Sequence, residues 1–322
     1  MAQHHFGVVA VRPHSCHTQK VTDVDRAQPR RALFASAALL ILLLTGCAGP
    51  VGANGSEPIR SPVPSSTDTS STEHLRKKLA QLPGVDAVVG GETGLTVEMP
   101  ADASRTDIVA TAEETHALAT EARFPAEIWI TRIGGGYNPD LDVTTQPPWT
   151  FPVYPGEIEP TLATVTGVLD VEEIAGTSGL TVIDGWPYVT IADITEFASV
   201  FDAVSATSLF ASGGTYSTGS DHLQIVHVPT RTSTEAIHAI VDIAVNHPTA
   251  EVLLQATTAG PQWPQLYVAR LSTDEAAAID ARLRSPALAD TDPDGHPQRF
   301  QLSVIGPDGP VYTLGTFGNV PG

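Results

Sequence analysis

The heptad GETGLTV at residues 91–97 returns 85 positions later as GTSGLTV at 176–182, with five of the seven residues identical. In both copies we expect a short strand to lead through the glycines into a second strand, because glycine supplies the positive φ that tight hairpin turns need. A helix-like stretch precedes each copy, at 73–81 and at 161–169. The heptad therefore predicts an internal repeat, and a repeat of this length organises the whole fold.

A helix and an alternating strand are expected after each copy. In the second copy, Ile194, Phe197, Phe201 and Val204 recur at the spacing of one helix face over 193–204. The first copy predicts a helix over 104–122. Alternation of apolar and polar residues then predicts a strand at 126–131 and another at 223–228. Each unit reads helix–strand–strand–helix–strand.

A third unit is expected without the heptad. Thr232 and Glu235 form one capping-box pattern, and Ser272 and Glu275 form another, so each pair predicts the start of a helix. The intervening and following segments predict strands at 250–256, 264–271, 299–305 and 311–318, the last two joined by a GPDG turn.

The sequence thus predicts an α+β fold of three tandem αββαβ sandwiches, with helices on one face of small antiparallel sheets. The expected division is a signal peptide at 1–46, a lipidated cysteine and disordered tether at 47–72, unit 1 at 73–134, a Pro-rich linker at 135–156, unit 2 at 157–229 and unit 3 at 230–322. Trp149, Phe151 and Tyr154 of the linker are expected to pack on a neighbouring unit or on a partner.

The order αββαβ resembles the BON domain, a small envelope-associated module of bacteria, and it equally resembles a ferredoxin-like repeat. Gly94 and Gly179 suit the hairpin glycine of BON domains, whereas the Gly-Val that often precedes the last BON strand is missing before Ala126 and Leu223. The BON resemblance implies association with a membrane or phospholipid, and it carries no site residue to this chain.

The segment before the tether has the order of a lipoprotein signal. Arg26, Arg30 and Arg31 precede an uncharged apolar run at 32–44, and Leu44-Thr45-Gly46-Cys47 follows. The run is shorter than the roughly 20 residues that a membrane span needs. This pattern resembles the lipobox of bacterial lipoproteins. The resemblance implies that Cys47 receives a diacylglycerol and that the bond between Gly46 and Cys47 is cleaved; the alternative is a signal-anchor with an incidental cysteine.

The resemblance also implies a location, the outer face of the cytoplasmic membrane, with the lipid bilayer as partner through acylated Cys47. Residues 1–20 make the signal unusually long, and a start at Val21 gives a more typical length. Arg30-Arg31 fits twin-arginine export only loosely, so general secretion is favoured. The composition is typical of a high-GC, actinobacterial genome.

Cysteine usage and charge exclude several classes of function. The chain has two cysteines, Cys16 and Cys47, so the exported body would carry neither a disulfide nor a thiol nucleophile. The formal net charge is −19, from 17 Lys+Arg and 36 Asp+Glu. Removal of residues 1–46 discards five basic and two acidic residues and leaves −22. Such a surface repels nucleic acid, so no nucleic-acid partner is expected.

One motif points to a cation. Asp290, Asp292 and Asp294 alternate before Gly295 as D-x-D-x-D-G, and oxygen ligands of this kind suit calcium. An EF-hand needs Glu at the twelfth position, where this chain has Gln301. The alternative is an exposed acidic turn, with no cofactor at all.

No catalytic constellation stands out in the sequence. The chain lacks a G-x-S-x-G nucleophile elbow, and Gly134-Gly135-Gly136 lacks the lysine of a phosphate loop. His238 and Asp242 are spaced to pair on a helix. We therefore expect a noncatalytic interaction or scaffold lipoprotein of the cell envelope with an envelope protein as partner. The alternatives are a ligand-binding or sensory lipoprotein, for calcium, lipid or a cell-wall component, and an envelope hydrolase.

Overall fold

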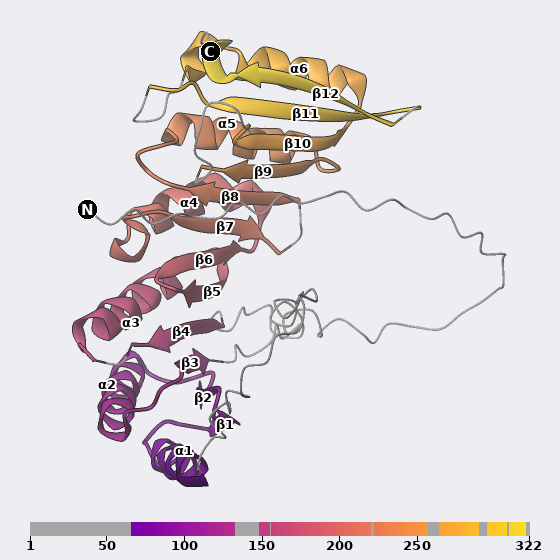
Figure 1. Cartoon of the computed structure of the whole chain (residues 1–322). Helices are drawn as coiled ribbons and strands as arrows, with labels where there is room; N and C mark the ends of the chain where they lie inside the picture. Colours follow the sequence, from indigo (N-terminus) through magenta and orange to yellow (C-terminus); the bar gives the residue numbers. More distant parts are fainter. Residues whose placement is uncertain are drawn as a thin grey trace, which may run out of the picture. The chain divides into compact units, whose positions relative to one another are not determined.

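The computed structural model describes residues 66–132, 148–154, 156–219, 222–256, 264–289, 295–307 and 309–319, and of 66–70 only the backbone. These residues belong to one compact unit, Ser61–Gly322. The unit contains a single sheet of twelve strands (Figure 1). The sheet and its helices confirm the predicted α+β class.

Helices and strands alternate in a regular way, with one helix before each pair of strands. The helices are α1 Ser66–Leu79, α2 Arg105–Ala122, α3 Glu159–Glu172, α4 Phe197–Ser205, α5 Thr234–Asn246 and α6 Thr273–Leu283, with short 3-10 turns η1 Ile194–Glu196, η2 Ser208–Phe210, η3 Pro286–Leu288 and η4 Phe317–Asn319. The strands are β1 Ala87–Gly91, β2 Gly94–Met99, β3 Ile128–Arg132, β4 Trp149–Val153, β5 Thr177–Ile183, β6 Trp186–Ile191, β7 Gly214–Thr218, β8 Leu223–His227, β9 Glu251–Gln255, β10 Leu266–Leu271, β11 Arg299–Gly306 and β12 Gly309–Thr316.

The strands lie in the sheet in the order of the chain, from β1 to β12. Within each pair, β1–β2, β3–β4 and so on to β11–β12, the strands are antiparallel. Between pairs, as from β2 to β3, the strands are parallel, and α2, α3, α4, α5 or α6 lies in the connection. The sheet is therefore a series of hairpins joined by helical crossovers.

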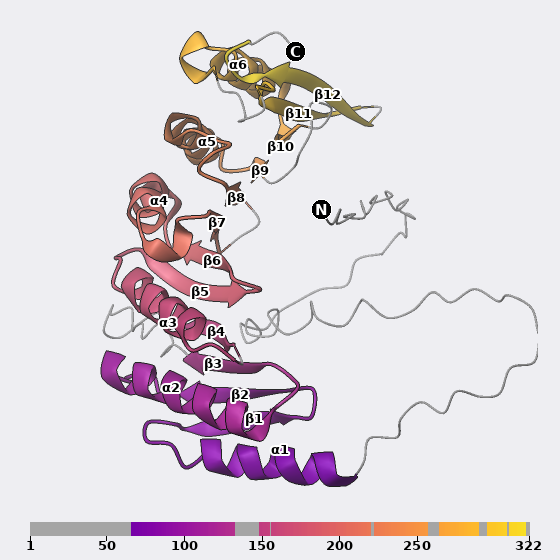
Figure 2. The ribbon, with the colours of Figure 1, turned by 60° about the vertical axis from the view of Figure 1, so that its left-hand side comes forward.

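The helices lie on one face of the sheet (Figure 2). All five crossovers advance in the same direction, because the strand order never reverses. The strands of successive crossovers run in opposite directions, since a hairpin separates them. A preference for right-handed crossovers would therefore place successive helices on opposite faces. The helices share one face because all the strands turn their apolar side chains toward it.

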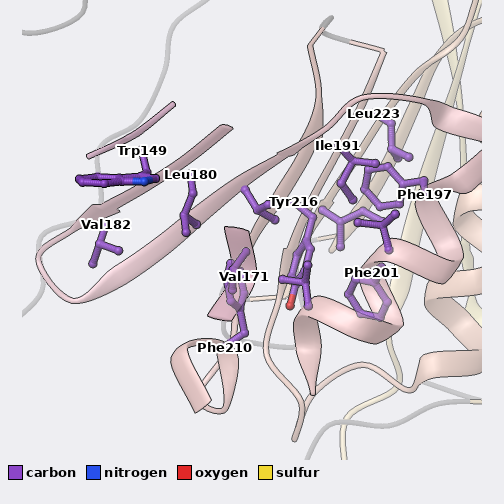
Figure 3. Packing of buried hydrophobic residues seen from close by; sticks show 14 of the residues in the cluster. Trp149, Val171, Leu180, Val182, Ile191, Phe197, Phe201, Phe210, Tyr216 and Leu223 are labelled. Atoms are coloured by element: carbon purple, nitrogen blue, oxygen red, sulfur yellow. The ribbon is translucent and has the colours of Figure 1, made fainter. Parts of the chain in front are cut away.

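One row of cross-strand partners carries the core from β2 to β12. The row runs through Met99, Arg132, Trp149, Leu180, Val189, Tyr216, Ile225, Leu254, Leu266, Phe300 and Gly315. The side chains of Trp149, Tyr216 and Phe300 are at most 1 % exposed. Under α4, the ring centroids of Phe201 and Tyr216 lie 4.7 Å apart (Figure 3). Because side chains alternate between the faces of a strand, the neighbouring positions face away from the helices.

The division into three units with separate antiparallel sheets is not confirmed, since all twelve strands share one mixed sheet. Three strands, β4, β6 and β7, were absent from the prediction, and the segment before Gly176 that was expected as a strand is the end of α3 and the turn after it. Strand β7 is short and begins with a glycine, so it lacks the length and the alternation that predict a strand. Strand β4 lies in the segment predicted as a Pro-rich linker.

Strand β4 accommodates its proline at a position where little pairing is lost. Pro152 pairs with Trp129 of β3, whereas β5 pairs only with Trp149 and Thr150 of β4. The missing N–H of Pro152 therefore costs no ladder bond toward β5. Trp149 and Phe151 are buried in the core, which confirms that this stretch packs on the rest of the fold.

The two heptads occupy different places in their hairpins. In the first copy, GLTV lies in β2, the second strand of a hairpin. In the second copy, Thr177–Ile183 is one uninterrupted strand, β5, and the turn follows it at Asp184 and Gly185, both with positive φ. The prediction of a hairpin inside 176–182 is wrong, because the Asp-Gly turn at 184–185 sets the hairpin after the heptad.

The helix starts follow the predicted capping chemistry closely. Ser272 and Glu275 form the predicted capping box of α6, with both reciprocal hydrogen bonds present. For α5 the cap is Ser233, whose hydroxyl accepts from the N–H of Ala236, and not the predicted Thr232. Thr232 is buried instead, and its hydroxyl accepts a hydrogen bond from Gln298.

A buried ion pair ties the second hairpin to α3. Arg132 Nη2 lies 2.6 Å from Glu172 Oε1, and the two side chains are 1 % and 9 % exposed. The indole N–H of Trp149 donates to the other oxygen of Glu172 at 3.1 Å. The Arg132 guanidinium also lies 5.2 Å from the centroid of the Trp149 ring. Both charges are therefore removed from water and held by each other and by the indole.

Replacement of Arg132 by Met should destabilise the fold far more than loss of an exposed arginine. The change leaves the Glu172 carboxylate buried without its cation, which costs about 3–5 kcal/mol. The matched control is Arg105→Met on α2, because Arg105 pairs with Asp170 while both are 43 % exposed, so its loss should cost less than about 1 kcal/mol. Urea denaturation of the full chain measures both; equal losses would contradict the importance of the buried pair.

Candidate functional site

The residues predicted to carry lipid or metal lie outside the described residues. These are Gly46 and Cys47 of the lipobox, and Asp290, Asp292 and Asp294 of the calcium motif. Within the described ranges, no group of three His, Cys, Asp or Glu side chains gathers as a metal site would. None of the helices in those ranges is long and apolar enough to cross a membrane.

The predicted pair of His238 and Asp242 does not form. His238 Nε2 lies 2.9 Å from Asp202 on α4, and Asp242 accepts from Arg282 on α6 at 2.6 Å. Both residues therefore link α5 to its neighbouring helices, and sequence spacing on one helix could not show that partners on adjacent helices lie closer.

The face of the sheet away from the helices, here called the open face, is rich in hydroxyl and amide side chains. No described residue packs over it as a layer (Figure 2). Two cross-strand rows run along it. The first is Glu98, Thr131, Thr150, Thr181, Tyr188, Thr215, Val226 and Gln255. The second is Gly179, Thr190, Ser217, Gln224, Leu253, Tyr267, Gln301 and Leu314.

The open face is electrically neutral although the chain is strongly acidic. Within the bounds of the twelve strands it carries two carboxylates, Glu98 and Glu251, and two guanidiniums, Arg270 and Arg299. Glu251 and Arg270 form an ion pair with each other. The formal charge of this face is zero, whereas that of the chain is −19. The excess negative charge therefore lies elsewhere, on helices and connections.

A groove of about 590 Å³ lies on the open face over β6, β7, β8 and β9. Its polar lining includes the hydroxyls of Thr190, Ser217 and Thr218 and the amide of Gln224, and Leu253 supplies an apolar wall. The volume is in the range of small-molecule sites. The groove draws on four strands that lie side by side only in the folded sheet, so no motif along the sequence could reveal it.

Two tyrosines of the open face neighbour the residues that line this groove. Tyr188 precedes Thr190 by two residues on the same face of β6 and is 39 % exposed. Tyr267 of β10 lies directly opposite Leu253. Burial raises the pKa of the Tyr267 phenol, so this side chain is neutral at physiological pH. The groove thus has neutral donors and acceptors in its lining, and one tyrosine lies beside the lining residues on β6 and another on β10.

The helix side of the same strands buries titratable groups in an aromatic cluster. The rings of His227 and Phe201 lie 5.1 Å apart, and His227 Nε2 donates to the carbonyl of Thr232 at 3.3 Å. Burial lowers the pKa of His227, and it raises that of Tyr216, which has no charged partner in the described part of the chain. These groups are neutral parts of the core, and they do not reach the groove on the other face.

Comparison with known proteins gave no match, either to a protein-family model, to a curated protein or to a solved structure.

His227 should make the stability of the fold depend on pH. Its folded pKa lies below the ordinary value of about 6.5, so the unfolded chain binds the extra proton first. The free energy of unfolding should therefore fall as the pH drops below about 6.5, until the lowered folded pKa is passed. Chemical denaturation between pH 8 and pH 5 measures this slope.

In the variant His227→Leu, the free energy of unfolding should depend less steeply on pH, because the contribution of His227 is lost. The contribution of the other histidines to this pH dependence should remain. His238→Leu serves as the control, since His238 is 41 % exposed and pairs on the surface. An unchanged slope in His227→Leu would show that the buried imidazole does not govern the acid sensitivity.

Proposed function

We propose that this chain is a membrane-anchored extracytoplasmic lipoprotein that acts as a noncatalytic interaction or scaffold module of the cell envelope. The observation that carries the proposal is the neutral open face, a broad surface of hydroxyl, amide and aromatic side chains on an otherwise acidic chain. A lipid on Cys47 would hold the module at the outer face of the cytoplasmic membrane, with 47–72 as the tether. The lipobox sequence supports this anchor.

The arrangement of the described side chains supports a binding role over a catalytic one. The hydroxyls of the groove lie among Gln224 and Leu253, with no histidine among the lining residues that could serve as their base. Glu251, the carboxylate of the groove, is paired with Arg270. Such a surface offers complementary hydrogen bonding to a partner without activating a nucleophile.

A ligand-binding or sensory lipoprotein is the second candidate, and the 590 Å³ groove favours it. Calcium at Asp290, Asp292 and Asp294 stays a proposal of the sequence. An envelope hydrolase is the third candidate and has no described constellation in its favour.

The threefold internal repeat is also a proposal. The predicted units would correspond to α1 to β3, α3 to β8 and α5 to β12, with β4 in the segment predicted as a linker. The alternation of one helix with two strands along the chain supports it. A scaffold built by repetition grows in length without changing its face, which suits the proposed role.

Crosslinking in living cells tests the proposed function. A photo-reactive residue is placed in the full-length chain at Thr150 on the open face or, as the control, at exposed Glu114 on α2. The proposal predicts that the open-face position captures an envelope component and that the helix position does not. Equal capture from both positions would contradict the assignment of the binding surface.

The anchor is tested in the same cells by Cys47→Ala. Without the thiol no acyl chain can be attached, so the variant should leave the membrane fraction and lose its crosslinks, while wild type stays membrane-bound. A Cys47→Ala chain that remains in the membrane would overturn the lipobox interpretation and point to the signal-anchor.

A further inference from the structure

The groove over β6 to β9 carries polar groups that are not used by the fold. In the described part of the chain, the side chains of Thr190, Ser217 and Gln224 form no hydrogen bond with other protein groups. Hydroxyls both donate and accept, and an amide supplies two donors and an acceptor. These three residues lie in adjacent strands in one cross-strand row, so their groups follow one another about every 4.8 Å. The row is a ladder of neutral hydrogen-bonding groups.

The charges of the groove lining limit the class of ligand that it can bind. The single carboxylate in the lining, Glu251, is matched by Arg270 across the strand pair. A cation would find no unpaired carboxylate in the lining, and an anion would meet no excess positive charge. The acidic remainder of the chain further repels polyanions such as nucleic acids. The ligand that suits this groove is therefore neutral and rich in hydroxyl or amide groups.

The position of the groove excludes a peptide strand as its occupant. Peptides that add to a sheet do so at a free edge, where backbone N–H and C=O groups are unpaired. The groove lies over β6, β7, β8 and β9, each of which is paired with a strand on both sides. Recognition here must use side chains. A bilayer surface is equally unsuited, since the lining is mainly polar.

Two tyrosines beside the lining residues, one on β6 and one on β10, complete the pattern. Tyr188 and Tyr267 stand four strand spacings apart, about 19 Å. An aromatic face binds the C–H face of a sugar ring, because the negative face of the ring attracts weakly positive C–H groups. The length between the two tyrosines suits an extended chain of several sugars, and not a single one.

We propose that the open-face groove binds a neutral saccharide chain, whose hydroxyl or acetamido groups bond to Thr190, Ser217 and Gln224 and whose rings pack against Tyr188 and Tyr267. The inference rests on the proposed function in assigning the interaction surface to the open face, and it adds the class of the partner. Binding of a saccharide by the purified protein does not depend on the lipid anchor. This inference and the proposed function can therefore fail separately.

Titration calorimetry with the full-length protein in detergent tests this inference. The probes are two neutral tetrasaccharides, one of N-acetylglucosamine and one of glucose, and a tetragalacturonate as the anionic comparison. At least one neutral probe should bind. The difference between the two neutral probes would distinguish recognition of acetamido groups from recognition of hydroxyls. The tetragalacturonate should bind at least about tenfold more weakly than the neutral probe. Failure of both neutral probes at millimolar concentration, or equal binding of the anionic one, would overturn the inference.

Variants locate the site. Gln224→Glu keeps the shape of an exposed side chain and adds a charge, and Tyr267→Ala removes one of the two tyrosine rings; each should weaken binding about tenfold or more, the equivalent of about 1.4 kcal/mol. The matched control is Gln301→Glu, which adds the same charge in the same cross-strand row but beyond Tyr267, and it should stay within about twofold of wild type. Thermal unfolding confirms that each variant is folded, and Gln224→Glu serves as the test if Tyr267→Ala is not.

Unchanged binding by Gln224→Glu, or an equal loss in Gln301→Glu, would overturn the assignment of the groove. Open-face crosslinks to an envelope protein, with no saccharide bound, would leave the proposed function standing and refute this inference. Saccharide binding by a chain that never reaches the membrane would support this inference and refute the proposed membrane-anchored function.

Discussion

Burial of one apolar face of a continuous sheet is the constraint on which the rest of the structure depends. All the helices lie on that face, although the strands of successive crossovers run in opposite directions. The helices are therefore not shared between the two faces of the sheet, as they are in doubly wound folds. One face receives the core row from Met99 to Phe300, and the other is left to polar side chains. Function, on this account, follows from a surface that the topology leaves uncovered.

The two faces of each strand divide the chemistry between them. On the helix side, charges occur where a partner is built in, as with Arg132, Glu172 and the Trp149 indole, and His227 is held neutral by burial. On the open side, the few charges balance and neutral groups predominate. A face without net charge in a chain of net charge −19 avoids the self-repulsion that the remaining surface carries, so a neutral partner can approach it closely.

The local parts of this fold could be predicted from sequence, and its assembly could not. Helix periodicity predicts α4 through Phe197 and Phe201, and the Ser272–Glu275 capping box predicts the start of α6. Strand β4 was not predicted because the prolines in and around it are typical of a linker, and β7 was not predicted because it is only five residues long. The heptad was misleading because Leu and Val at alternate positions suit any strand with one buried face. The groove depends on the register of four strands, a property that no single stretch of sequence contains.

The most direct test of the central claim asks whether the open face is covered in the cell. The chain has no cysteine beyond Cys47, so a single cysteine can be placed at Gln224 or Thr150 on the open face, or at Glu114 or Glu235 on the helix side, and reacted with a membrane-impermeant maleimide. The account predicts that the helix-side thiols react equally fast in intact cells and in purified protein, while the open-face thiols react only after purification. Equal reactivity of both faces in intact cells would contradict it.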